Sequence, residues 1–239
     1  MIGLGTIINI GGILLGGMLG LLFGGFLNER MQMTLMKTMG VCTAVLGLAG
    51  TMEKMLVVEN GQITSRGSLL LILSLVLGAI IGELLDIEKR FTDFGEWLKQ
   101  KSGNGGDAGF TDAFVTASLT VAIGAMAVIG SINDGLFGDY SVLTVKALLD
   151  LVIIMIMTSI MGRGCIFSAI PVGILEGGMT LLARLISPLL NEQALAGLSM
   201  VGSVLILLIG MNLIWPKLIR VSNLLPAIIL SLILAQFLL

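Results

Sequence analysis

Apolar segments long enough to cross a lipid bilayer recur along the whole chain. A transmembrane helix needs about 20 predominantly apolar residues, and windows of that length select approximately residues 4–26, 34–52, 68–85, 113–132, 142–161, 165–185, 194–214 and 221–239. The last segment is short. The sixth contains Pro171 and Glu176, so it fits a broken or re-entrant helix as well as a straight one. We therefore predict an all-α polytopic membrane bundle of about eight transmembrane helices, with seven as the alternative.

The composition supports a single membrane domain over residues 1–239. Hydrophobic residues make up 56% of the chain and charged residues only 12%, about half the charged share of a soluble domain. Histidine is absent, and Cys42 and Cys165 each stand without a second thiol nearby. These features argue against a zinc site, a structural disulfide or hydrolytic chemistry. We expect no metal, no cofactor, no nucleic-acid partner and no enzymatic activity.

Basic residues divide unevenly between the two sides that eight spans would create. Because cytoplasmic loops collect Lys and Arg, this bias predicts which side faces the cytoplasm. Both termini are then expected outside it. One side receives Arg30, Lys89, Arg90, Lys99, Lys101, Arg163, Lys217 and Arg220, and the other receives only Lys54 and Arg66.

A polar stretch on the basic side has the pattern of an amphipathic helix. Within residues 88–98, helical spacing puts Phe91, Phe94, Trp97 and Leu98 on one face. We expect a cytoplasmic interfacial helix here.

The chain also repeats itself. Residues 12–18, GILLGGM, return at 173–179 as GILEGGM, and Leu-Asn-Glu at 27–29 returns at 190–192. Five spans separate the copies, and because this number is odd the copies would enter the membrane from opposite sides. The predicted organisation is a repeat over about 1–87, central helices with the interfacial helix over about 88–161, and an inverted repeat over about 162–239. Chance similarity between glycine-rich helices is the alternative.

Glycines recur at four-residue spacing in three of the predicted spans. Such small faces let transmembrane helices approach closely, so helix packing is their first interpretation. A second is a smooth surface for sliding, or a pore lined by backbone. The glycines are Gly12, Gly16, Gly20, Gly24, Gly78, Gly82, Gly173 and Gly177.

Charged residues inside the apolar spans are the main candidates for a functional site. Each costs about 2.5 to 3.5 kcal/mol at the bilayer centre, so it is expected to face the bundle interior. Lys146 and Asp150 are four residues apart on one helical face, where they could form either a structural ion pair or a solute or proton site. Glu176 stands among glycines at the position where the other repeat copy has Leu15.

Three uncharged or span-end polar residues complete the candidate set. Asn9 lies in the first span, and Asn133 and Asp134 lie at the polar end of the fourth, where an exposed turn is the alternative. The candidates for substrate or ion binding are Asn9, Asn133, Asp134, Lys146, Asp150 and Glu176.

Several motifs resemble a known family. The opening GTIIN at 5–9, ASL at 117–119, GSINDGL at 130–136, GD at 138–139 and KALLD at 146–150 resemble the YdfK/YqgA-like family of bacterial polytopic membrane proteins. The resemblance runs nearly end to end and implies a bacterial inner-membrane protein. The family has no assigned function, so it implies no substrate and no catalytic residues. The resemblance also implies that other members carry an amide side chain near the position of Glu176, where this chain has a carboxylate.

Two functions from different classes fit these observations. The first is a transporter or permeation pathway for a small solute or ion, with its site between the repeats at mid-membrane. The second is a non-transporting scaffold or assembly factor whose glycine faces bind partner helices. The expected partners are the lipid bilayer and a small solute or ion, and self-association into a homo-oligomer stays open.

Overall fold

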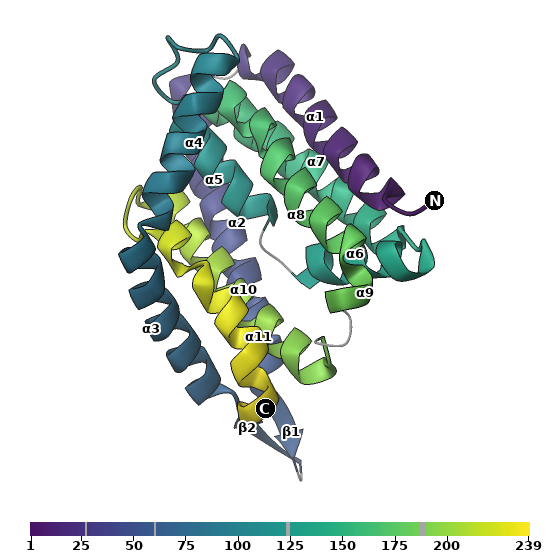
Figure 1. The fold of residues 1–239 in the computed structure, drawn as a ribbon. Coiled ribbons are helices and arrows are strands. Elements are labelled where there is room, and N and C mark those ends of the chain that lie inside the picture. Colours follow the sequence, from purple (N-terminus) through teal and green to yellow (C-terminus); the bar gives the residue numbers. More distant parts are fainter. Residues whose placement is uncertain (27, 60, 123–124, 187–189) are drawn as a thin grey trace. The chain divides into compact units, whose positions relative to one another are not determined.

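The computed structural model describes residues 1–26, 28–59, 61–122, 125–186 and 190–239, and these are almost entirely helical (Figure 1). The predicted all-α polytopic bundle is confirmed. The helices are α1 (Leu4–Gly24), α2 (Glu29–Met55), α3 (Ser68–Leu85), α4 (Ile87–Lys101), α5 (Phe110–Ala122), α6 (Ala125–Phe137), α7 (Ser141–Met161), α8 (Ala169–Leu181), α9 (Ala183–Ile186), α10 (Glu192–Ile214) and α11 (Pro226–Leu238), with the short 3-10 helices η1 (Arg163–Ser168) and η3 (Val221–Leu224).

Seven helical segments of the described chain are long and apolar enough to cross a membrane. The predicted fourth span differs from the others, because it falls on two helices, α5 and α6, whose axes are bent by 63°. Residues 123–124 of that predicted span lie outside the described residues. The predicted sixth span, for which a broken and a straight helix were both open, falls on η1, α8 and α9, and its part Arg163–Leu181 is a single candidate span. Counted together, α5 and α6 give an eighth span.

The chain forms two compact units, each built from segments far apart in the sequence. The first comprises residues 1–38 and 90–187, and the second comprises residues 39–89 and 188–239. An apolar core in the first unit joins Ile13 of α1 to Ile154 of α7 and Val172 of α8. A core in the second joins Leu70 of α3 to Met200 of α10 and Ala235 of α11.

Glycines set the closest helix packing in the first unit. A Cβ atom on Gly12, Gly16 or Gly20 of α1 would overlap the backbone of α7, so only glycine permits this approach. The contacts advance in step along both helices, which therefore run parallel, side by side (Figure 1). Gly12, Gly16 and Gly20 lie against the carbonyl oxygens of Ala147, Leu151 and Met155, in that order.

Three other helix pairs run antiparallel. In the first unit α1 packs against α8, with Ile10 beside Gly173 and Thr6 beside Gly177. In the second unit α3 packs against η3 and α11, and α2 packs against α10 (Figure 1). The contacts in the second unit are Gly78 with Ala227, Gly82 with Asn223, Gly40 with Gly210, and Gly47 with Leu207.

These directions decide how many times a membrane-spanning chain crosses. Because α1 and α7 are parallel, an odd number of crossings must separate them; α2 and α3 supply two, and α5 with α6 supplies the third. The antiparallel pairs α1–α8, α2–α10 and α3–α11 likewise require that α5 and α6 together cross the membrane once. If each of the seven long helices crosses the membrane, these directions require that α5 and α6 together cross as well, which agrees with the count of eight.

A β-hairpin and an amphipathic helix lie outside the predicted spans. Strands β1 (Leu56–Glu59) and β2 (Gln62–Ser65) form an antiparallel hairpin that the sequence analysis did not predict. The predicted amphipathic helix forms as α4, and its apolar face packs on α5, with the rings of Phe94 and Phe114 5.8 Å apart. Trp97 of α4 remains 52% exposed.

Candidate functional site

A buried lysine in the first unit joins three helices. The Lys146 ammonium on α7 donates to the carbonyl oxygen of Val121 over 2.8 Å. It also forms the predicted i, i+4 ion pair with Asp150 on the same helix. Its third acceptor is Glu176 Oε1 on α8, at 3.3 Å. Only 7% of the Lys146 side chain is exposed, so these contacts replace its hydration.

The Val121 carbonyl is free to accept because α5 ends one residue later. The last four carbonyl groups of an α-helix have no partner within the helix, and together they carry the negative end of its dipole. Lys146 therefore satisfies an end of α5 as well as two carboxylates.

Glu176 receives its hydrogen bonds on one oxygen only. The Asn9 amide on α1 donates from Nδ2 to Glu176 Oε1 over 2.8 Å, and Lys146 approaches the same oxygen. The other carboxylate oxygen, Oε2, has no partner, and neither does Asn9 Oδ1. Both residues are fully buried. Buried polar atoms are normally paired, so two unpartnered acceptors on one bonded pair of residues call for an explanation.

The charges of the cluster do not balance. With all three groups ionised, the Lys146 ammonium faces the carboxylates of Asp150 and Glu176, which leaves one net negative charge. The surrounding unit also holds buried hydroxyl oxygens without a hydrogen-bond partner. These belong to Thr6, Ser118, Ser131, Thr158 and Thr180.

Glycines let α1 and α8 approach closely enough for the Asn9–Glu176 bond to form. Gly173 lies against Ile10, and Gly177 lies beside Thr6, on either side of the bonded pair. The structure thus brings together four of the six predicted site residues from three helices: Asn9, Lys146, Asp150 and Glu176.

The other two candidates lie elsewhere. Asp134 is fully buried in α6, and its carboxylate accepts hydrogen bonds from the backbone N–H groups of Gly3 at 3.1 Å and Gly5 at 2.9 Å. It therefore caps the N-terminus of α1. Asn133 is half-buried beside it in α6. The alternative of an exposed turn at these two positions is wrong, because α6 continues to Phe137 and carries Asp134 into the interior.

A carboxylate at the start of α7 has a similar capping role at the surface. Asp139 accepts a hydrogen bond from the backbone N–H of Ser141 over 3.0 Å. This bond to the ionised form holds the pKa of the Asp139 carboxyl below its usual value.

Sequence reasoning missed the Val121 carbonyl, because a backbone acceptor carries no residue-type signal. It also named Asn9 and Glu176 separately, since their bond depends on helix packing across 167 positions. Among the described residues, no group of three or more Cys, Asp and Glu side chains is placed to hold a metal ion.

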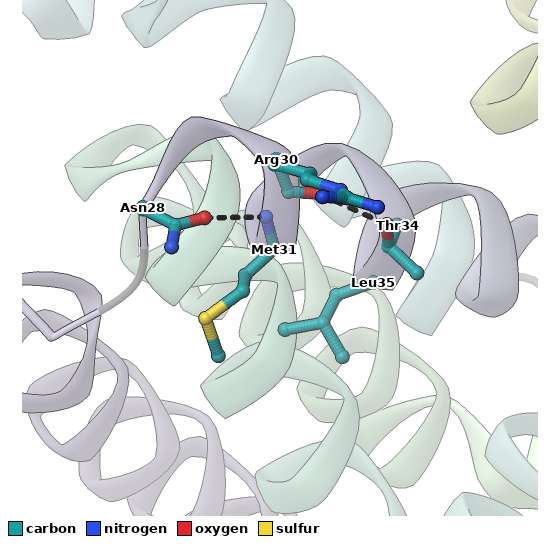
Figure 2. Close-up of a pocket in the computed structure, with 5 residues that line it drawn as sticks. All are labelled: Asn28, Arg30, Met31, Thr34 and Leu35. Carbon is teal, nitrogen blue, oxygen red and sulfur yellow. Dashed lines mark hydrogen bonds between the residues drawn. The ribbon is translucent and has the colours of Figure 1, made fainter.

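An open pocket lies at the start of α2, away from the charged cluster. Its lining comes from the first turns of that helix, as Figure 2 shows: Asn28, Arg30, Met31, Thr34 and Leu35. Asn28 caps the backbone N–H of Met31 at 2.9 Å, and the Thr34 hydroxyl donates to the Arg30 carbonyl. These bonds belong to the helix itself, so the pocket does not indicate a ligand.

The fold and the buried charges define a polytopic membrane protein of unknown function. The chain belongs to the family described as "Protein of unknown function (DUF554)", which matches residues 4–236. It is 25% identical over 226 residues to the "Uncharacterized membrane protein YdfK" of Bacillus subtilis (strain 168), covering 95% of this chain and 93% of that protein. It is 28% identical over 232 residues to the "Uncharacterized protein YqgA" of Escherichia coli (strain K12), covering 95% and 94%. No solved structure matches.

Proposed function

We propose that this protein is a transporter or permeation pathway for a small solute or ion in the bacterial cytoplasmic membrane. The observation that carries the proposal is the charge imbalance of the Lys146, Asp150 and Glu176 cluster inside an apolar unit. Ionisable groups are costly in a membrane interior and usually mark a pathway for a substrate or ion.

A purely structural role fits the cluster less well. An ion pair that only fixes the register of two helices needs one charge of each sign, and Lys146 with Asp150 already supplies it. Glu176 adds a second carboxylate that is fully buried and only half satisfied. A ligand that completes this site explains the excess, whereas packing alone does not.

The helix pairs support an inverted repeat as the framework of the pathway. Under the proposed repeat, α1 corresponds to α8, α2 to α10, and α3 to α11. Each of these helices packs antiparallel against its own counterpart. Copies related by an axis in the membrane plane would pack in this way, and transporters with such repeats bind their ligands near the midplane at broken helices.

The scaffold alternative loses part of its basis. It required glycine faces free to bind partner helices. Each of the glycines named for packing instead has another part of this chain within 4 Å of where its Cβ would lie, so these faces are occupied within the chain.

The distribution of basic residues supports an orientation of the protein in the membrane. It favours a cytoplasmic location for α4 and an outer location for both ends of the chain.

The test is flux through the purified protein in liposomes. Imposed gradients of Na⁺, K⁺ and H⁺, followed by ion-sensitive dyes, and a panel of small solutes, followed by uptake, should reveal at least one flux above protein-free liposomes. Equal rates with and without protein for every gradient and solute would reject the transport proposal in favour of a non-transporting protein.

A further inference from the structure

Two oxygen atoms in the site are buried, unpartnered and carried by residues that bond each other. They are Asn9 Oδ1 and Glu176 Oε2, both on fully buried side chains. An amide oxygen and the oxygens of an ionised carboxylate can only accept, and the Asn9 amide nitrogen already donates to the other oxygen of Glu176. Such a pair lacks a positive charge or a donor. Amide and carboxylate oxygens are also the ligands that hard cations prefer.

The net charge of the cluster determines the charge of the ion that would complete it. The titratable groups that act on Glu176 are Lys146 and Asp150, both on α7, while α1 contributes the neutral Asn9 and α5 the Val121 carbonyl. Asp134 on α6 is occupied at the start of α1. One monovalent cation balances the remaining negative charge. A divalent ion would leave a net positive charge, and an anion would double the negative one.

Lys146 is placed to exchange with that cation. Its contact with Glu176, at 3.3 Å, is longer than its 2.8 Å bond to the Val121 carbonyl. If a cation neutralises Glu176, the ammonium keeps Asp150 and Val121 as partners. Binding and release can therefore alternate without leaving Lys146 as an unpaired buried charge.

We propose that Asn9 and Glu176 bind one monovalent cation, Na⁺ or a proton, in exchange for the Lys146 contact. This inference rests on the proposed function and identifies the ion that the pathway carries or couples to. A sodium ion would take both free oxygens as ligands. A proton would bond to Glu176 Oε2 and convert that oxygen from an unpartnered acceptor into a donor.

Binding can be measured on the purified protein in detergent, without any gradient. Thermal unfolding is followed while Na⁺ replaces choline at constant ionic strength and at several pH values. For sodium, the unfolding midpoint should rise with the logarithm of Na⁺ concentration. For a proton, sodium should have no effect, and infrared difference spectra should show a titrating carboxylic-acid C=O band that is present in the wild-type protein and absent from Glu176→Gln. Either result supports the proposal, and the absence of both overturns it.

Three variants assign the effect to the site. Glu176→Gln should abolish the sodium shift or the titrating band, and Asn9→Ala should weaken apparent sodium affinity by about tenfold, the equivalent of one lost ligand. Glu83→Gln, which alters an exposed carboxylate 3.4 Å from Arg220 in the second unit, should change neither signal. A full effect persisting in Glu176→Gln overturns the proposal. If that variant does not fold, the wild-type titration and Asn9→Ala still decide.

The outcome is separable from the test of transport. Cation binding at Glu176 without flux would uphold this site and reject the transport function. Flux without cation binding would do the reverse.

Discussion

Asn9 and Glu176 lie 167 positions apart, and the amide nitrogen of one donates to the carboxylate of the other over 2.8 Å in the fully buried interface between α1 and α8. Under the proposed repeat, the symmetry-related pair of positions holds Leu15 and Ile170, which are apolar. A duplicated framework would thus carry a polar bond at only one of two equivalent places. This asymmetry favours one binding site per chain.

Because Lys146 contacts both Asp150 and Glu176, the effects of substituting these two carboxylates on the unfolding free energy should be strongly non-additive. Asp150→Asn alone leaves Lys146 paired with Glu176, and Glu176→Gln alone leaves it paired with Asp150, so each should cost only about 1 kcal/mol of unfolding free energy. The double variant strands a buried ammonium and should cost about 3 to 5 kcal/mol. Unfolding in detergent measures all three. Additive effects would show that Lys146 does not bridge the carboxylates.

The α1–α7 contact predicts that one methyl group is too many at Gly16. In Gly16→Ala the new Cβ overlaps the Leu151 carbonyl, and overpacking of this kind costs about 1 to 3 kcal/mol. The matched control is Gly11→Ala on the same helix, where nothing lies within 4 Å. Thermal unfolding should separate the two variants clearly. Equal midpoints would mean that α1 and α7 do not pack through this face.

The parity of the helix pairs predicts that α5 and α6 together cross the membrane. Single cysteines at Gly105 and Tyr140, before and after this pair, should therefore lie on opposite sides. The exposed Cys42 is first replaced by serine, whereas Cys165 is buried. A membrane-impermeant maleimide added to intact cells should label Tyr140→Cys, and should label Gly105→Cys only after permeabilisation. Labelling of both from one side would make the pair re-entrant.

Asp134 is expected to serve folding rather than transport. Asp134→Ala removes the acceptor for the backbone N–H groups of Gly3 and Gly5 and should cost about 1 to 2 kcal/mol of stability. Asp134→Asn keeps one carbonyl acceptor and should cost less. Asp139→Ala, at the exposed cap of α7, is the control with a smaller effect, because water can replace its bond. Loss of ion selectivity in a stable Asp134→Asn protein would instead place Asp134 in the pathway.

The sequence predicts the spans well because their physical signal is strong. A run such as residues 68–85 has no charged residue except Glu83 near its end, and the structure begins and ends α3 at the same two residues. The hairpin of β1 and β2 was not predicted, although the dipeptide Asn60-Gly61 between two short strand-like runs is a strong hairpin signal. The bend between α5 and α6 is not marked by a proline, and glycine, which stands there as Gly124, also recurs within unbroken helices such as α1.

The candidate site was predictable in its members but not in its geometry. The cost of charges in apolar spans is enough to select Lys146, Asp150 and Glu176. Asp134 was selected with them because it too is polar and near a span, and only the packing of α6 against the start of α1 shows that it caps that helix. Spacing within one helix is visible in a sequence, as for Lys146 and Asp150, whereas contacts between distant helices are not.

The most direct test of the account compares cation-driven current through liposomes containing the wild-type protein, Glu176→Gln or Glu83→Gln, reconstituted at equal density. The account predicts a current in the wild-type protein that depends on Na⁺ or H⁺, its loss in Glu176→Gln, and its retention in Glu83→Gln. Equal currents in the wild-type and Glu176→Gln liposomes would contradict it.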